Sequence, residues 1–205
     1  MTLRKTALFG AFLLVGAPVV AQAQTDTALG TVPAARYPYT AADVHFISGM
    51  IGHHAQAIVM AKWAPTHGAS KSVLVLCERI INAQTDEIAL MQRWLAVRHQ
   101  PVPEAKAGPM KMMMNGMEMD MLMPGMLSDS QMKVLDASRG ANFDKHFLQF
   151  MIQHHQGAMT MVNELFASAG GGQDDVMYKF ASDVYADQGT EIDRMQKMLF
   201  QLLGK

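Results

Sequence analysis

Two pairs of adjacent histidines stand inside apolar stretches of this chain. His53 and His54 interrupt FISGMIGHHAQAIVMA, and His154 and His155 interrupt FLQFMIQHHQGAMTM. A buried imidazole without a partner costs about 1 kcal/mol or more, so each ring must be hydrogen-bonded or bound to something. The two pairs therefore predict either a hydrogen-bonded polar core or a metal site.

Methionines accompany both histidine pairs. Met50 precedes His53 and His54 by three and four residues, and Met151 stands at the same distance before the second pair. Imidazole nitrogen and thioether sulfur on one helix face suit copper, and sulfur favours the monovalent ion. The candidate metal ligands in the helices are His53, His54, His154, His155, Met50, Met60, Met151, Met159 and Met161.

Polar residues on two later helical segments are candidates for a supporting role. Gln84 and Glu87 lie on one helical row, and Gln188 and Glu191 lie on the equivalent row further along. Hydrogen bonds from these side chains would orient the ring nitrogens in a metal site, or would satisfy them in a plain core. Two other histidines near helix starts, His45 and His146, are further candidates for this role.

A methionine-rich segment lies between the histidine pairs. Its sequence, PMKMMMNGMEMDMLMPGM, contains Met110, Met112, Met113, Met114, Met117, Met119, Met121, Met123 and Met126. Its Gly, Pro and Asn residues argue against a continuous helix or strand, so we expect a mobile connector. Three uses remain open: an apolar surface for a protein partner, a trap for oxidants, and capture of Cu(I) or Ag(I) by thioethers.

The histidine pairs belong to two copies of one unit. Residues 43–60 and 144–161 are identical at nine of eighteen positions, and residues 84–95 match residues 188–199 at six of twelve. This internal similarity indicates a tandem duplication. Apolar residues at helical spacing in each copy predict a helical hairpin.

Two hairpins with apolar faces predict an all-α fold, an antiparallel four-helix bundle. Capping boxes are expected at Thr40 with Asp43 and at Ser128 with Gln131. We expect helices over residues 40–64, 70–98, 129–138, 142–169 and 174–203. The expected organisation is a signal peptide (1–23), a linker (24–39), a first hairpin (40–98), a Met-rich connector (99–128), and a short helix with the second hairpin (129–205).

The N-terminus predicts export. Arg4 and Lys5 precede an apolar run and the cleavable pattern Ala-Gln-Ala, so we expect cleavage after Ala23, a periplasmic or secreted protein, and no membrane insertion afterwards. The rest carries 15 basic and 18 acidic residues, a net charge of −3, which argues against nucleic acid as a partner. Cys77, the single cysteine, is interpreted as a small core residue.

The duplicated motif F-x-x-x-M-I-x-H-H, followed by Q-x-x-E-I-x-x-M-Q, resembles the exported domain-of-unknown-function 305 family. This resemblance covers nearly the whole mature chain and implies a ferritin-like fold. Family members include CopM-like copper-binding proteins of the bacterial periplasm, so the resemblance implies binding of copper, Cu(I) or Cu(II), and of silver, with a role in copper tolerance.

We therefore expect a non-catalytic protein that sequesters copper or transfers it to another periplasmic copper protein. A ferritin-like di-metal oxidase is disfavoured, because the Glu-x-x-His motif of such bundles occurs nowhere in this chain. A structural or interaction module, whose histidines only satisfy the core, remains the alternative.

Overall fold

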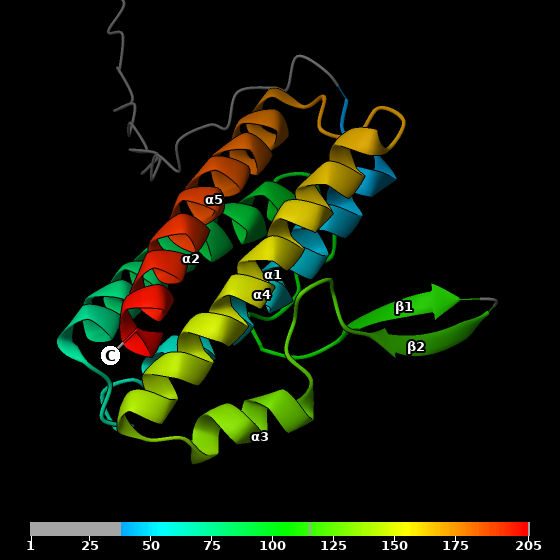
Figure 1. Ribbon diagram of the computed structural model, residues 1–205. Coiled ribbons are helices and arrows are strands. Elements are labelled where there is room, and N and C mark those ends of the chain that lie inside the picture. The colour runs from blue at the N-terminus through cyan, green and yellow to red at the C-terminus, as the bar shows by residue number, and fades with distance from the viewer. Residues whose placement is uncertain (1–37, 115, 205) are drawn as a thin grey trace, which may run out of the picture. The chain divides into compact units, whose positions relative to one another are not determined.

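The computed structural model of the protein describes residues 38–114 and 116–204. The helices are α1 (Ala41–Lys62), α2 (Lys71–Ala96), α3 (Asp129–Ala137), α4 (Gly140–Ala167) and α5 (Asp175–Leu203), and the strands are β1 (Met110–Met114) and β2 (Met117–Met121). The prediction of a mostly helical protein is confirmed, with one small sheet added (Figure 1). The expected signal peptide and nearly all of the linker lie outside the described residues.

Local sequence signals explain where the helices begin. Thr40 and Ser128 form the predicted capping boxes with Asp43 and Gln131. Each pair satisfies backbone N–H groups that have no partner inside the helix. Asp174, which the sequence analysis did not single out, caps α5 by accepting hydrogen bonds from two backbone N–H groups. Within the described ranges, no helix combines the length and apolarity that a membrane crossing requires.

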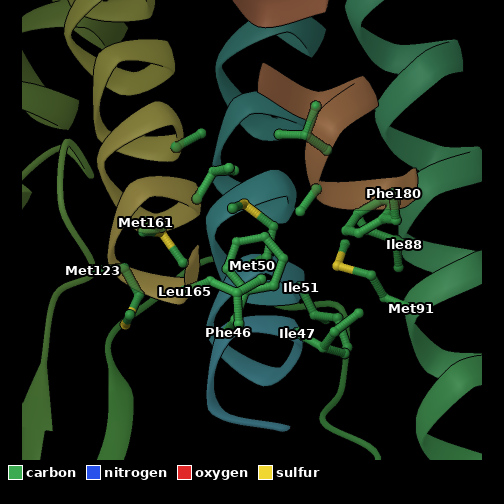
Figure 2. Close-up of a cluster of buried hydrophobic side chains, with 14 of the residues drawn as sticks. Phe46, Ile47, Met50, Ile51, Ile88, Met91, Met123, Met161, Leu165 and Phe180 are labelled. Carbon is green, nitrogen blue, oxygen red and sulfur yellow. The ribbon is translucent and has the colours of Figure 1, made fainter. Parts of the chain in front are cut away.

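The long helices share two apolar clusters. α1 packs against α2 and α4, and α4 packs against α5. Figure 2 shows one cluster, in which side chains from all four long helices meet around Phe46 and Met50. The other cluster gathers around Phe143, Phe147 and Met151. Burial of these apolar side chains is the main source of stability.

Two equivalent aspartates link the hairpins to each other. The Asp43 carboxylate accepts the backbone N–H of Gly172, in the turn after α4, at 2.8 Å. The Asp144 carboxylate accepts the backbone N–H of Ser70, in the turn before α2, at 3.1 Å. Both carboxylates are buried. Each copy therefore holds the turn of the other copy, and this is the structural role of the aspartate that the repeats share.

We expect Asp43→Ala to lower the free energy of unfolding by about 2 kcal/mol, because it removes a helix cap and a buried hydrogen bond. Urea denaturation measures the change. Asp183→Ala, which removes an exposed partner of Lys179, is the control and should cost less than about 0.5 kcal/mol. Equal effects of the two substitutions would contradict the role assigned to Asp43.

The Met-rich connector contains regular structure, so the prediction of an irregular segment is wrong. β1 and β2 form an antiparallel hairpin whose register pairs Met110 with Met121, Met112 with Met119, and Met114 with Met117. In β2 the methionines alternate with Glu118 and Asp120, which gives the period of a strand, and the Asn-Gly between the two strands favours a tight turn. Gly116 has φ 78°, a conformation that glycine adopts readily.

Candidate metal centre

The histidine pairs and their polar neighbours form a layer between the two apolar clusters. Along α1, Ile51 belongs to one cluster and Ala57 to the other, and His53 and His54 lie between them. The same change of cluster occurs around the second pair on α4 and around the polar residues of α2 and α5. We call this set the polar layer: His53, His54, Gln84, Glu87, His154, His155, Gln188 and Glu191.

All four histidines of the polar layer are fully buried. Their position inside apolar stretches predicted burial, and the structure confirms it. Gln84 and Gln188 are also buried, whereas Glu87 and Glu191 are half-buried. A buried layer of this composition needs a partner for each polar atom.

The second histidine of each pair, which we call the outer histidine, is hydrogen-bonded to a glutamate. Nε2 of His54 donates to Glu87 Oε2 at 2.7 Å, and Nε2 of His155 donates to Glu191 Oε2 at 2.8 Å. A carboxylate accepts hydrogen bonds, so each of these two rings carries a proton at Nε2. The same arrangement orients histidines that bind a metal through their other nitrogen.

The first histidine of each pair, which we call the inner histidine, donates to a backbone carbonyl instead. His53 Nε2 donates to the carbonyl of Pro124, and His154 Nε2 donates to the carbonyl of His53, each at 3.0 Å. Carbonyl oxygens only accept, so these two rings also carry their proton at Nε2. Their ring centroids are 3.8 Å apart, which places the two copies of the motif in direct contact.

The second nitrogen, Nδ1, of each of the four rings is buried and has no hydrogen-bond partner among the described residues. Gln84 Oε1 and both polar atoms of the Gln188 side chain are unpaired as well. The glutamines therefore do not satisfy the rings. Of the polar core expected from Gln and Glu, only the two hydrogen bonds to Glu87 and Glu191 are present. The four Nδ1 atoms are therefore the ring nitrogens that remain to bind a cation.

The inner histidines are neutral at neutral pH. Burial, followed by repulsion from His54, lowers the pKa of His53 to about 3, against the opposing effect of the hydrogen bond to the Pro124 carbonyl. Burial, followed by repulsion from His53, places the pKa of His154 well below its ordinary value. A neutral imidazole is the form that binds a metal ion.

The donor set suits a soft ion with few ligands. Among the described residues, no three His, Cys, Asp or Glu side chains lie close enough to hold one ion. A structural zinc ion takes four such ligands, so the polar layer does not match that type of site. Monovalent copper and silver accept imidazole and thioether together.

Residues 123–127 close one side of the polar layer. Gln56 binds the backbone of Leu127 twice, through Leu127 N–H at 2.7 Å and the Leu127 carbonyl at 2.9 Å. A Cβ atom added at Gly157 would lie 2.0 Å from the Pro124 carbonyl oxygen, so this contact requires glycine. The sequence named Met123 and Met126 as candidate ligands but did not lead to the expectation of this close contact, although the Pro124-Gly125 pair and the helical Gly157 are signals of a close backbone approach.

The other candidate ligands occupy three kinds of position. Met50, Met60, Met151, Met161, Met123 and Met126 are buried in the apolar clusters, and Met159 is half-buried. Met123 and Met126 lie in the predicted connector, but their side chains pack into the core. His45 is exposed. His146 lies 2.7 Å from Ser138 Oγ and stacks on Phe150.

The β1–β2 hairpin exposes a row of thioethers. Met117, Met119 and Met121 are exposed and alternate along β2, so they share one face of the strand. Lys111 pairs with Glu118 at 2.7 Å, which places the charges on the opposite face. Met110 at the hairpin base packs against the core, and the side chains of Met112, Met113 and Met114 lie outside the description.

Cys77 is a buried free thiol. Burial, followed by the charge of Asp144, raises its pKa to about 12. The thiolate is the form that binds metals, so Cys77 is inert as a ligand at neutral pH. This position agrees with its interpretation as a small core residue.

Comparison with known proteins gives solved structures with the same fold. A DUF305 protein from Streptomyces coelicolor is 28% identical with a TM-score of 0.64, and the match covers 78% of this chain and 93% of that one. A DUF305 fragment from Deinococcus radiodurans is 26% identical with a TM-score of 0.65 and coverages of 80% and 99%.

CopM is also similar. Its Cu(I)-bound form is 27% identical, with a TM-score of 0.58 and coverages of 80% and 97%, and CopM was also solved with Cu(II) and with silver. No curated protein sequence matches the chain. The family model described as Domain of unknown function (DUF305) matches residues 43–199. Since this match spans most of the chain, the protein belongs to the DUF305 family.

Proposed function

We propose that the protein binds Cu(I), and also Ag(I), as a cargo, without catalysing a reaction, and that it serves copper tolerance. The observation that carries this proposal is the set of four buried Nδ1 atoms, unpaired in rings whose Nε2 protons are held by protein oxygens. Burial keeps the inner rings neutral, and Glu87 and Glu191 orient the outer rings. The likeness to CopM, solved with Cu(I) and silver bound, supports the choice of ion.

The β1–β2 hairpin supplies the accessible part of this function. Its thioethers at Met117, Met119 and Met121 are exposed and lie on one strand face, opposite methionine positions on β1. Thioethers bind Cu(I) without losing a proton and discriminate against hard ions such as Mg²⁺. The hairpin captures the ion, and the polar layer retains it for storage or for transfer to another periplasmic copper protein.

The proposal also includes the fold and the cellular location that we expect for the protein. The four long helices act as one ferritin-like four-helix bundle, and the mature chain works in the periplasm after loss of residues 1–23. The polar layer is where the bundle keeps its donors away from water. No catalytic step is assigned to any residue.

The test is a titration of the metal-free protein with Cu(I) in competition with a chromophoric chelator. We expect wild type to remove Cu(I) from the chelator, and Glu87→Gln with Glu191→Gln to weaken the affinity about 10–100-fold, because both rings lose the carboxylate that orients them. Glu78→Gln on the exposed side of α2 is the matched control and should bind like wild type.

Two results would overturn the proposal. If wild type never competes with the chelator, the protein is not a copper carrier and the polar layer is structural. If the double glutamate variant keeps full affinity while its melting temperature falls, the carboxylates stabilise the fold and do not orient ligands.

A further inference from the structure

A small surface pocket near the start of α1 brings together donors that lie far apart in the sequence. Its volume is about 60 Å³, and it is lined by His45 from α1, Met123 from the segment after β2, and Met161 and Glu164 from α4. Phe46 and Leu165 complete its apolar wall. Figure 2 shows Met123 and Met161 on the same side of the apolar cluster, beside Leu165.

The donors differ in exposure in a way that suits an entry site. The His45 ring is exposed, so it can reach an ion in solution. The thioethers are almost covered, with Met123 6% exposed and Met161 2% exposed. One nitrogen and two sulfur donors beside an apolar wall favour a soft monovalent ion, because a hard cation would exchange most of its water for the single carboxylate of Glu164.

The duplicated position in the second copy lacks this arrangement. His146 is the equivalent of His45, but its ring lies against Ser138 Oγ at 2.7 Å and stacks on Phe150. Met123 belongs to neither copy, because it lies in the connector between them. The pocket is therefore a feature of the tertiary structure that the repeat does not generate twice.

Met123 also connects this pocket to the polar layer. Its neighbour Pro124 accepts the hydrogen bond of His53, and its own side chain packs on Gly49 of α1, 3.1 Å from Sδ to a Cβ placed there. Along the chain, Met123 therefore stands between the last residue of β2, Met121, and Pro124, which binds His53.

We propose that His45, Met123 and Met161 form a separate binding site for one Cu(I) or Ag(I) ion, accessible from solution. Glu164 at the rim attracts the cation, and the two thioethers and the imidazole bind it. This site rests on the proposed function and names the place where the ion enters the helical part of the protein.

The test uses the full chain labelled with ¹³C at the methionine methyl groups, and Ag(I) as a diamagnetic probe. Met123→Leu and Met161→Leu assign the two methyl signals, and this substitution conserves volume. We expect both signals to shift together during the titration, and His45→Gln to weaken that response at least about tenfold, an effect of about 1.4 kcal/mol. His146→Gln is the matched control and should leave the response unchanged.

The outcomes separate this site from the general function. Unchanged affinity at Met123 and Met161 in His45→Gln would overturn the site. A response of Met117, Met119 and Met121 with none at the other two methyl groups would overturn the site alone and leave capture by the hairpin standing. No response of any methionine would overturn both. His45 is exposed, so its variant remains decisive even if a core methionine variant fails to fold.

Discussion

Gly157→Ala is expected to destabilise the protein by about 3 kcal/mol, although alanine favours helices over glycine by about 1 kcal/mol. The added Cβ would lie 2.0 Å from the Pro124 carbonyl oxygen and 2.4 Å from Gly125 Cα. Both are backbone atoms, so no side-chain rotation relieves the overlap. Residues 123–127 would have to move away from α4, and His53 would lose the carbonyl to which it donates.

Chemical denaturation of Gly157→Ala, with Gly189→Ala as the matched control, measures this effect. Gly189 is also helical, but its added Cβ would lie 3.8 Å from Met159 Cε, an ordinary contact. The control should therefore raise stability by about 0.5–1 kcal/mol. Changes of opposite sign in the free energy of unfolding would support the packing of residues 123–127 against α4. A stabilising effect of Gly157→Ala would show that this segment does not lie against α4.

The metal-free protein is expected to lose stability as the pH falls from about 6.5 towards 3. The folded state lowers the pKa of His53 to about 3 and that of His154 well below its ordinary value, chiefly through burial. The unfolded chain binds protons at both residues in this range and the folded chain does not, so protonation favours unfolding. The stabilising contribution is complete above the unfolded pKa, and each histidine removes about 1.4 kcal/mol per pH unit below it.

Urea unfolding in the presence of a metal chelator, between about pH 7 and pH 5, measures this slope. The double variant His53→Gln with His154→Gln should show a flatter pH dependence than wild type. His99→Asn is the control, because His99 is exposed and asparagine tolerates its positive φ of 54°. Equal slopes in wild type and in the double variant would mean that the two rings are protonated in the folded state.

Gly157→Ala and the His53→Gln, His154→Gln double variant both test how residues 123–127 and the polar layer pack together. Gly157 sets how closely residues 123–127 approach α4, and this approach gives His53 its hydrogen-bond acceptor. That hydrogen bond places the ring proton at Nε2 and leaves Nδ1 as the free donor atom. A glycine on one helix therefore controls the chemistry of an imidazole on another.

Sequence patterns predicted most of the helical structure, because the signals are local. The expected helix over residues 40–64 is α1, and the capping boxes at Thr40 and Ser128 are present. His53 and His54 both face inward, since a period of 3.6 residues puts them on the same broad apolar face as their neighbours. Asn115-Gly116, followed by the alternating methionines of residues 117–121, was an equally local hairpin signal, but Asn and Gly were interpreted only as residues that break regular structure.

The sequence by itself therefore predicted the helices, the family and the inward direction of the paired histidines, and it contains the internal similarity of residues 43–60 to residues 144–161. Only the tertiary structure decided which nitrogen of each ring is unpaired, that residues 123–127 pack into the core, and that His45 shares a pocket with Met123 and Met161. The physical reason is distance along the chain: periodicity and capping act within a few residues, whereas the bonds of His53 to Pro124 and of His154 to His53 join positions 71 and 101 residues apart. Such contacts exist only after the helices have packed.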